Sequence, residues 1–240
     1  MAEANFSDHR LDLQRDGFTN FSLGKMPSLL ALQRGLIDLS SRYATRPLKA
    51  LDQLHEVLPL SSLNSLRLEA IQAIHRDTEF RADLSNKVAP LLIDLLGPDL
   101  AVQKKFNLVI SIPGDPGSQI PMHADTWTGN SPFELNLWIP LTEVAGTQSM
   151  FILPLQKWKA RKREWDRHTG TIQDCMENWR DDFRFIALSP GEVLLFWHAL
   201  PHGNVVNQEK STRWALNLRF KNTFTPYGEK SLGDYFTPWK

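Results

Sequence analysis

Apolar residues recur at helical spacing through the first hundred positions of the chain. They do so in PSLLALQRGLIDLSSRY and again in SLNSLRLEAIQAIHRD. A third segment runs from about Thr78 to Leu96 and stops at a Gly-Pro pair, which is typical of a helix end. Spacing of this kind puts apolar side chains on one helix face, and Ser61 or Ser62 would be the N-cap of the second helix. We therefore expect residues 1–100 to be mainly helical.

From residue 104 onward the pattern changes to short β-rich runs. KKFNLVISI alternates and ends in the loop signal PGDPG, and it is followed by ELNLWIPL, SMFILP, EVLLFW and TRWALNLRF. Each run is bounded by turn residues, as strands usually are. Strands that follow a helical start predict an α+β fold, with a curled β-sandwich or barrel backed by helices.

Two of these strands have one apolar and one polar face. Successive side chains of a strand point to opposite sides, so TRWALNLRF carries Arg213, Asn217 and Arg219 on the face opposite its tryptophan and leucines. In ELNLWIPL the corresponding face carries Glu134, Asn136 and Trp138. Alternation alone leaves two interpretations open. The polar faces either form outer surface or line an internal pocket.

Composition excludes several classes of protein. The 240 residues contain 27 Lys and Arg against 27 Asp and Glu, so no global charge attracts nucleic acid or an acidic membrane. The single cysteine, Cys175, rules out an intrachain disulfide framework and a thiolate zinc cage. The N-terminal residues lack a signal-peptide pattern, and no apolar run approaches the ~18–20 residues that span a bilayer. We expect a cytoplasmic globular protein.

The tripeptide HAD suggests a metal site. His123 and Asp125 stand two positions apart in a segment expected to be extended, so both side chains can reach one ion. Two imidazoles and one carboxylate leave the opposite coordination face open, which suits a reactive Fe(II) centre. The third ligand would be a second histidine. His198 and His202 both lie in FWHALPHGN, just after a predicted strand.

An arginine adds a second binding element. Arg213 opens the last strand on its polar face, eleven residues after His202. A guanidinium in that position can hold a carboxylate by a two-pronged, charge-assisted contact. A metal tripod combined with such a clamp fits 2-oxoglutarate, whose keto-acid end would chelate the iron while the far carboxylate meets the arginine.

These motifs resemble a known family. HAD, LPHGN and the arginine eleven residues later are similar to the 2-oxoglutarate/Fe(II) dioxygenases, and the His-Gly pair resembles phytanoyl-CoA dioxygenase. The stretch GNSPFELNLWIPLTEVAGTQSMFILP more narrowly resembles oxygenases of sporadically distributed bacterial carbohydrate clusters, which are related to a streptomycin-pathway enzyme. The resemblance covers about residues 104–220.

The resemblance implies a double-stranded β-helix, that is, a jelly-roll or cupin-like barrel, with N-terminal supporting helices. It implies Fe(II) on His123, Asp125 and His202, with Arg213 on 2-oxoglutarate, and O2 as the other co-substrate. The expected reaction hydroxylates a carbohydrate or aminoglycoside-like intermediate and releases succinate and CO2. His202 is favoured over His198 by its spacing to Arg213 and by Gly203, which would permit close approach to a bound group.

Further site candidates each have a structural alternative. Asn136 and Asn204 are candidates for co-substrate contact, although relatives often carry serine in place of Asn204, and Asn136 could equally make a structural hydrogen bond. Gln119, Trp127 and Arg219 are candidates for substrate contact. The alternatives are a loop role for Gln119, core packing for Trp127 and a surface carboxylate as the partner of Arg219. Arg213 and Arg219 are separated by roughly 20 Å of extended strand, so both cannot hold one small dianion.

A basic insertion interrupts the strands between residues 156 and 182. Its first half carries Lys and Arg with Trp158 and Trp165 interleaved. It is either a helical lid that recruits an anionic substrate such as a phosphorylated sugar, or an amphipathic helix that packs its tryptophans on the barrel. Acidic residues such as Glu164 and Asp166 offset the charge, so nucleic-acid binding is not expected.

We predict one oxygenase domain over residues 1–240, with a jelly-roll core at 101–222 and a tail at 223–240 that either closes over the barrel or contacts another subunit. Its partner would be a small, sugar-related molecule, and a homo-oligomer remains open. Two rival functions are a non-redox metal-dependent jelly-roll isomerase or epimerase and a non-catalytic cupin-like binding module. Arg213 separates the oxygenase from both, because neither rival needs a dicarboxylate clamp.

Overall fold

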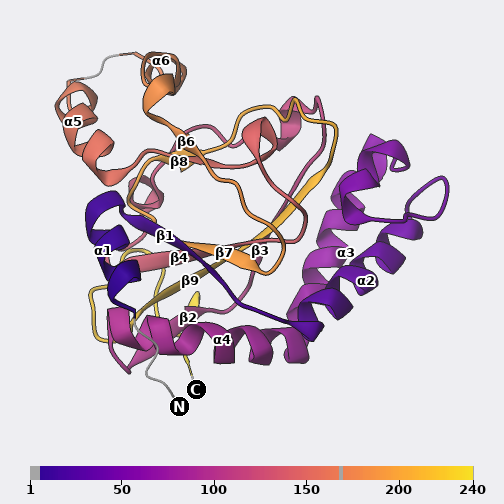
Figure 1. Ribbon diagram of the computed structural model, residues 1–240, viewed down its shortest axis with the longest axis horizontal. Helices are drawn as coiled ribbons and strands as arrows, with labels where there is room; N and C mark the ends of the chain where they lie inside the picture. Colours follow the sequence, from indigo (N-terminus) through magenta and orange to yellow (C-terminus); the bar gives the residue numbers. More distant parts are fainter. Residues whose placement is uncertain (1–5, 168–169, 240) are drawn as a thin grey trace.

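Two antiparallel sheets form the centre of the molecule in the computed structural model, which describes residues 6–167 and 170–239. The larger sheet has the strand order β1-β7-β4-β9-β2-β10, with β3 also paired to β9. Its strands are β1 (Phe18–Ser22), β2 (Leu100–Gln103), β3 (Asn107–Ser111), β4 (Glu134–Pro140), β7 (Glu192–Trp197), β9 (Arg213–Asn222) and β10 (Phe236–Pro238). The smaller sheet contains β5 (Phe151–Ile152), β6 (Arg184–Phe185) and β8 (His202–Gly203). It lies across from the larger one (Figure 1), which confirms the predicted jelly roll.

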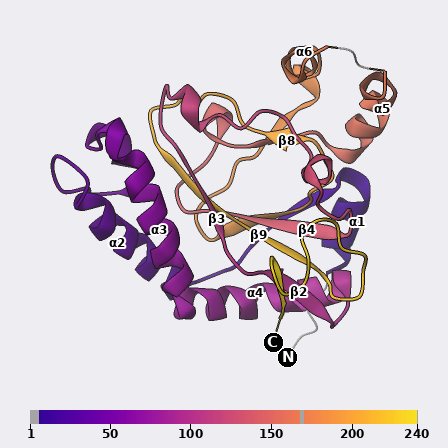
Figure 2. The same cartoon turned by 180° about the vertical axis from the view of Figure 1, so that it is seen from behind.

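Helices cover the other face of the larger sheet. They are α2 (Pro27–Ser41), α3 (Leu63–Arg76) and α4 (Thr78–Leu96), and α4 runs beneath the sheet while α2 and α3 lie at one end (Figures 1 and 2). Their apolar stripes share one hydrophobic cluster with the apolar faces of β4 and β9. The three helices predicted from the periodicity are confirmed, and so is the α+β class.

The helix ends differ in one respect from the sequence expectation. Ser62 occupies the N-cap position of α3 but makes no side-chain cap hydrogen bond, because a short 3-10 turn (Leu60–Ser62) already gives it helical torsion angles. Ser62 is therefore the N-cap residue, as expected, but its side chain does not cap the helix. The cap lies one helix later, where the carboxylate of Asp77 accepts a hydrogen bond from the backbone N–H of Phe80 at 2.8 Å. Gly97, with φ of 86°, ends α4 as expected.

Several short elements were not predicted from the sequence. They are α1 (Ser7–Asp16), β1, β2, β10 and the 3-10 helices Leu51–Glu56, Pro116–Ser118, Asp125–Thr128, Gly146–Gln148 and Arg180–Asp182. The helix α1 buries none of its residues fully, so its sequence has no apolar stripe to find. The tail that follows β9 returns to the same sheet, where β10 pairs with β2. Of the two interpretations of the tail, this pairing supports closure on its own barrel.

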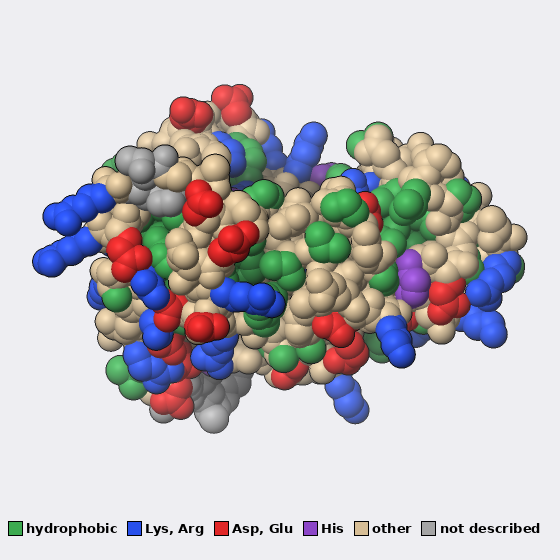
Figure 3. Space-filling model, turned by 90° about the horizontal axis from the view of Figure 1, so that it is seen from above, with side chains coloured by type: hydrophobic (Ala, Val, Ile, Leu, Met, Phe, Trp, Pro, Cys, Tyr) green, Lys and Arg blue, Asp and Glu red, His purple; other side chains and the backbone are tan. Residues whose placement is uncertain are grey.

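The insertion forms α5 (Leu155–Trp165) and α6 (Ile172–Asn178), as expected for a helical insertion. Trp158 is buried, and it packs with Trp165 and Trp179 in one aromatic cluster. Several basic side chains of α5 are already paired with acidic neighbours: Lys157 and Arg161 with Asp182, and Lys162 with Asp166. Figure 3 shows charges of both signs interspersed at this end of the molecule. These contacts favour the amphipathic interpretation over an anion-recruiting lid.

No helix in residues 6–167 and 170–239 is long and apolar enough to cross a membrane. The shared cluster of helices and sheet agrees with a common core, and the extent of the domain over residues 1–240 stays a prediction.

Candidate metal and co-substrate site

The polar faces of β4 and β9 point into a cavity of about 190 Å³ between the two sheets. Asn136 and Trp138 reach it from β4, and Arg213, Asn217 and Arg219 reach it from β9. The residues alternating with them belong to the cluster under the helices. The pocket interpretation of the alternation is therefore correct, and the outer-surface interpretation is wrong.

Three side chains at one end of this cavity could hold a metal ion. One ligand atom each of His123, Asp125 and His202 can be chosen so that all lie within 4.8 Å of one another. The two histidines belong to segments joined by a β-bridge, in which each backbone N–H donates to the carbonyl of the other residue at 2.8–2.9 Å. Asp125 does not continue the extended segment as expected, because it begins the 3-10 helix Asp125–Thr128. The turn still leaves its carboxylate beside both imidazoles.

Hydrogen bonds orient both imidazoles for metal binding. The Nδ1 atoms of His123 and His202 lie 2.9 Å from the carbonyl oxygens of Pro121 and Leu200. A carbonyl can only accept, so each Nδ1 carries a proton, and Nε2 is the nitrogen of each ring that is left to bind a metal. Burial, reinforced by the neighbouring His123, lowers the pKa of His202 to about 4. His202 is consequently neutral at physiological pH, as a ligand must be.

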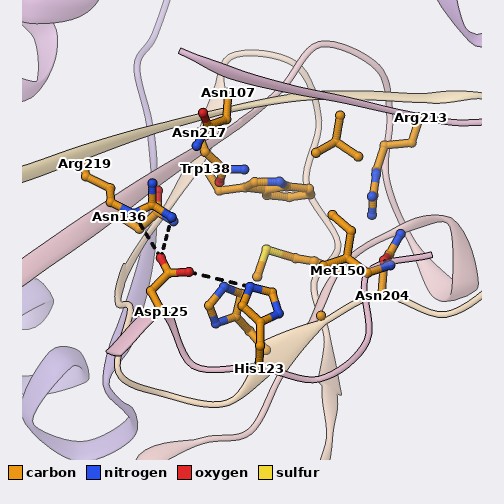
Figure 4. A pocket seen from close by; sticks show the side chains of 14 residues that line it. Asn107, His123, Asp125, Asn136, Trp138, Met150, Asn204, Arg213, Asn217 and Arg219 are labelled. Atoms are coloured by element: carbon orange, nitrogen blue, oxygen red, sulfur yellow. Dashed lines mark hydrogen bonds and ion pairs between the residues drawn. The ribbon is translucent and has the colours of Figure 1, made fainter. Parts of the chain in front are cut away.

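The two carboxylate oxygens of Asp125 have different surroundings. Oδ2 accepts from Nε and Nη2 of Arg219, at 2.9 and 2.6 Å, and lies 3.3 Å from Nδ1 of His198. Oδ1 faces Nε2 of His123 at 3.6 Å. Burial alone would raise the pKa of Asp125, but the neighbouring His123 and His198 and the charge of Arg219 lower it well below its usual range. The carboxylate therefore stays ionised with Oδ1 directed toward the metal position (Figure 4).

His198 occupies a supporting position. It is fully buried, and its Nε2 lies 2.6 Å from the carbonyl oxygen of Ser131. Its Nδ1 is directed at Asp125, with Glu134 Oε2 at 3.7 Å on the same side. The group that can share one ion contains His202 and not His198, and the role of His202 as the third ligand stays a prediction.

Arg213 lies at the other end of the cavity and has a buried guanidinium. Among residues 6–167 and 170–239, Nε and Nη1 find no hydrogen-bond partner. Burial lowers the pKa of Arg213 to about 10. Its side chain points into the cavity in Figure 4, away from Asp125. A buried cation with unpaired donors is costly unless an anion completes it, so this position fits a carboxylate ligand.

The other candidate residues have mixed surroundings. Asn136 and Asn204 both line the cavity, but the carboxamide of Asn204 already bonds to backbone groups of Ser118 and Ile120. The buried Oδ1 of Asn136 has no partner among the described residues. Co-substrate contact by these two asparagines stays a prediction.

The residues suggested for substrate contact are distributed more widely. Gln119 lines a separate surface pocket, and Trp127 stacks on Trp165 with ring centroids 4.3 Å apart. Neither belongs to the lining of the metal cavity. Arg219 does line it, but its guanidinium is bound to Asp125, so its partner is a buried metal-site carboxylate and not a surface one.

The expected role of Gly203, close approach to a bound group, is wrong. A Cβ at this position would lie 2.7 Å from the carbonyl oxygen of Ile120 and 3.0 Å from that of Pro121. The close approach permitted by the glycine is therefore to the segment that leads into His123, and not to a bound group.

Several other residues near the site were not proposed as candidates from the sequence. Asn107, Asn217 and Met150 line the cavity, and Tyr235 binds Arg219 from the tail. Alternation had already placed Asn217 on the polar face with Arg213, but it was not proposed as a site residue. Tyr235 gave no such signal, because its contact depends on how the tail folds back.

Comparisons with known proteins identify the family. Residues 63–215, well over half of the chain, match the family described as phytanoyl-CoA dioxygenase (PhyH). The chain therefore belongs to the phytanoyl-CoA dioxygenase family. No curated protein matches the chain.

Solved structures share the fold at low identity. HygX from Streptomyces hygroscopicus, with nickel and 2-oxoglutarate bound, superposes with a TM-score of 0.60 at 12% identity, over 97% of this chain and 92% of that one. The ThoJ non-heme monooxygenase–nickel complex gives 0.59 at 15% identity, over 96% and 83%. EctD from S. alaskensis with bound iron gives 0.58 at 15% identity, over 94% and 79%. At these identities the likeness establishes the fold.

The donor set present here fits the cofactors that the sequence led us to expect. Two imidazoles and one ionised carboxylate suit Fe(II) with open coordination positions, and the unpaired guanidinium suits the far carboxylate of 2-oxoglutarate. Family membership together with this site confirms Fe(II), 2-oxoglutarate and O2 as the cofactor set.

Proposed function

We propose that this protein is an Fe(II)- and 2-oxoglutarate-dependent dioxygenase that hydroxylates a C–H bond of a carbohydrate or aminoglycoside-like biosynthetic intermediate. The observation that carries the proposal is that the His–Asp–His group and an unpaired buried guanidinium face one cavity. A metal site alone suits many reactions. A buried cation without a partner additionally requires an anionic ligand.

The residues of the chain divide the binding work. His123, Asp125 and His202 would hold the metal, and Arg213 would hold the remote carboxylate of the co-substrate by a two-pronged contact. Arg219 cannot share that task, because its guanidinium is already bound to Asp125. His123 is the partly exposed ligand, with 31% of its side chain accessible, so substrate would approach from its side.

When bound, iron and 2-oxoglutarate supply the activation of O2, with one oxygen atom entering succinate as CO2 is lost and the other entering the substrate C–H bond. The protein contributes orientation and shielding. Buried His202 and Asp125 keep water from one side of the metal position, and the hydrogen bonds to Pro121 and Leu200 hold the imidazoles in one tautomer.

The carbohydrate part of the proposal rests on the resemblance of residues 129–154 to oxygenases of carbohydrate clusters. The expected partner is a small, sugar-related molecule. The two rivals, a non-redox isomerase or epimerase and a non-catalytic cupin-like module, give no role to Arg213, which disfavours both.

Anaerobic spectroscopy tests the proposal. Adding Fe(II) and then 2-oxoglutarate to the protein should produce a visible metal-to-ligand charge-transfer band. His202→Ala should abolish the band, and Arg213→Ala should raise the 2-oxoglutarate concentration needed for it by about a hundredfold, because a desolvated charge pair is lost. A folded, iron-loaded wild-type protein that shows no band with 2-oxoglutarate would refute the dioxygenase assignment.

A further inference from the structure

A row of carboxamides crosses the sheet on the cavity side. The register pairs Asn107 with Asn217, and Asn217 with Trp138, so these three side chains stand next to each other on β3, β9 and β4. Asn136 is two residues from Trp138 on β4 and is paired with Arg219. Figure 4 shows Asn107, Asn136 and Asn217 toward one end of the Trp138 ring, with Arg213 and Asn204 beyond the other. The row is therefore at the metal end of the cavity.

The carboxamides of this row differ in burial and in hydrogen bonding. Asn107 is exposed and its Oδ1 accepts from Nε2 of Gln103 at 3.3 Å, and Asn217 is half-buried. Asn136 is buried, and its Oδ1 has no partner among the residues described. Asn204, in the same cavity, shows the opposite arrangement because both ends of its carboxamide are bound to backbone. A buried acceptor without a donor costs free energy, which a ligand donor can recover.

The missing donor cannot come from the co-substrate. At neutral pH 2-oxoglutarate carries two carboxylates and a ketone, which are all acceptors. It could receive a hydrogen bond from a carboxamide N–H, but it could give none to Oδ1 of Asn136. The group that completes the row must carry an O–H or N–H.

The charged side chains that line the cavity indicate whether the substrate group bound by the row is itself charged. Among the charged side chains lining the cavity, Arg219 is bound to Asp125, and Arg213 stands at the far end with the co-substrate. Lys230 lies near Arg219, but its ammonium stacks on the Tyr235 ring at 4.8 Å and does not line the cavity. A phosphate at the carboxamide row would find no free cation in this lining, and an ammonium would find no free carboxylate.

We infer that the substrate presents uncharged hydroxyl groups of a polyol or sugar ring to Asn107, Asn136 and Asn217. This inference rests on the proposed dioxygenase function. Each carboxamide offers a donor and an acceptor, as adjacent hydroxyls require, and Trp138 offers an apolar ring to the C–H face of the same molecule. The recognised part is neither phosphorylated nor amino-substituted.

The experiment uses the wild-type protein loaded anaerobically with Fe(II) and 2-oxoglutarate. Methyl α-D-glucopyranoside and myo-inositol are titrated against glucose 6-phosphate, myo-inositol 1-phosphate and glucosamine, and the perturbation of the charge-transfer band gives each dissociation constant. We expect at least one uncharged probe to bind about tenfold more tightly than its phosphate or amine counterpart. Equal or tighter binding of the charged probes, or no perturbation by either uncharged probe at 100 millimolar (on the order of the weakest useful affinity), would overturn the inference.

Two variants locate the binding on the row. Asn217→Ala and Asn107→Ala should each weaken the uncharged probe about tenfold while the band with Fe(II) and 2-oxoglutarate persists, which also verifies folding. Asn222→Ala is the matched control, since Asn222 is on the same strand but its carboxamide bonds to Leu96 outside the cavity. If the two variants weaken 2-oxoglutarate binding and leave the probe unaffected, the row serves the co-substrate and the inference fails. Failure of the dioxygenase assignment is distinct, because it removes the band from the wild-type protein.

Discussion

Arg213 and Arg219 are six residues apart on β9 and face the same cavity, yet they have opposite surroundings. The Arg219 guanidinium binds Asp125 through two nitrogens and receives further contacts from Gln103 and Tyr235. The Arg213 guanidinium is equally buried, but Nε and Nη1 have no partner among the described residues. The Arg219 guanidinium finds its partners within the protein, whereas the Arg213 guanidinium needs a ligand to pair with Nε and Nη1.

The difference separates stability from function along one strand. A paired buried charge is expensive to break, whereas an unpaired one is expensive to keep. Arg219 thus stabilises the folded protein by fixing a metal ligand. Arg213 lowers the stability of the ligand-free protein and has a favourable environment only when a carboxylate is bound.

The largest expected effect is the loss of metal affinity when a proposed metal ligand is removed. His202→Ala should weaken Ni(II) or Fe(II) binding by more than about a hundredfold, because it removes one of three donors, whereas His198→Asn should weaken it about tenfold through Asp125. Isothermal titration calorimetry under anaerobic conditions measures both. If His202→Ala keeps the metal and His198→Asn loses it, the third ligand is His198 and the assignment to His202 is wrong.

Unfolding of the two arginine variants tests the comparison directly. Arg219→Met should destabilise the metal-free protein by about 3–5 kcal/mol, since it leaves the buried Asp125 carboxylate without its cation. Arg213→Met should stabilise it by about 1–3 kcal/mol, since it removes an unpaired buried charge. Urea unfolding without metal or 2-oxoglutarate gives both values. The comparison breaks if the two substitutions change stability in the same direction.

A smaller effect should follow from the tail. Tyr235→Phe removes the hydroxyl that contacts Nη1 of Arg219 and leaves the rest of the ring in place. We expect metal affinity to fall about two- to tenfold, the usual consequence of one lost hydrogen bond. Tyr43→Phe is a suitable control, because the Tyr43 hydroxyl bonds to Glu69 on the helical side. An equal loss in both variants would mean that the tail has no specific role at the metal.

The proposed ligand residues could be predicted from the sequence, whereas most of the residues that hold them in place could not. His123, Asp125, His202 and Arg213 could be proposed because short spacings and strand alternation are local properties, although alternation alone left open which face of β9 lines the pocket. Their roles as ligands and clamp stay predictions until metal and co-substrate binding are measured. The α+β jelly roll and the helices α2, α3 and α4 followed from the same periodicities.

The contacts that hold the ligands in place could not be predicted from the sequence, because they join residues that are far apart in the chain. Arg219 meets Asp125 across 94 positions of sequence, and Tyr235 reaches Arg219 only because β10 returns to β2. Trp127 was a candidate for the wall of the substrate cavity, with core packing as the alternative, but it lies in a 3-10 helix and stacks on Trp165. Long-range closure of a curled sheet decides such contacts, and local pattern contains no information about it.

The missing side chain of Gly203 has a consequence for engineering. A single added methyl would act as a wedge between the two β-bridged segments, because the peptide planes at 120 and 121 leave no clearance for it. The imidazoles would separate while every atom that touches iron kept its chemical identity. A sequence comparison restricted to the coordinating residues would score such a protein as intact, although the spacing on which its chelation depends had been lost.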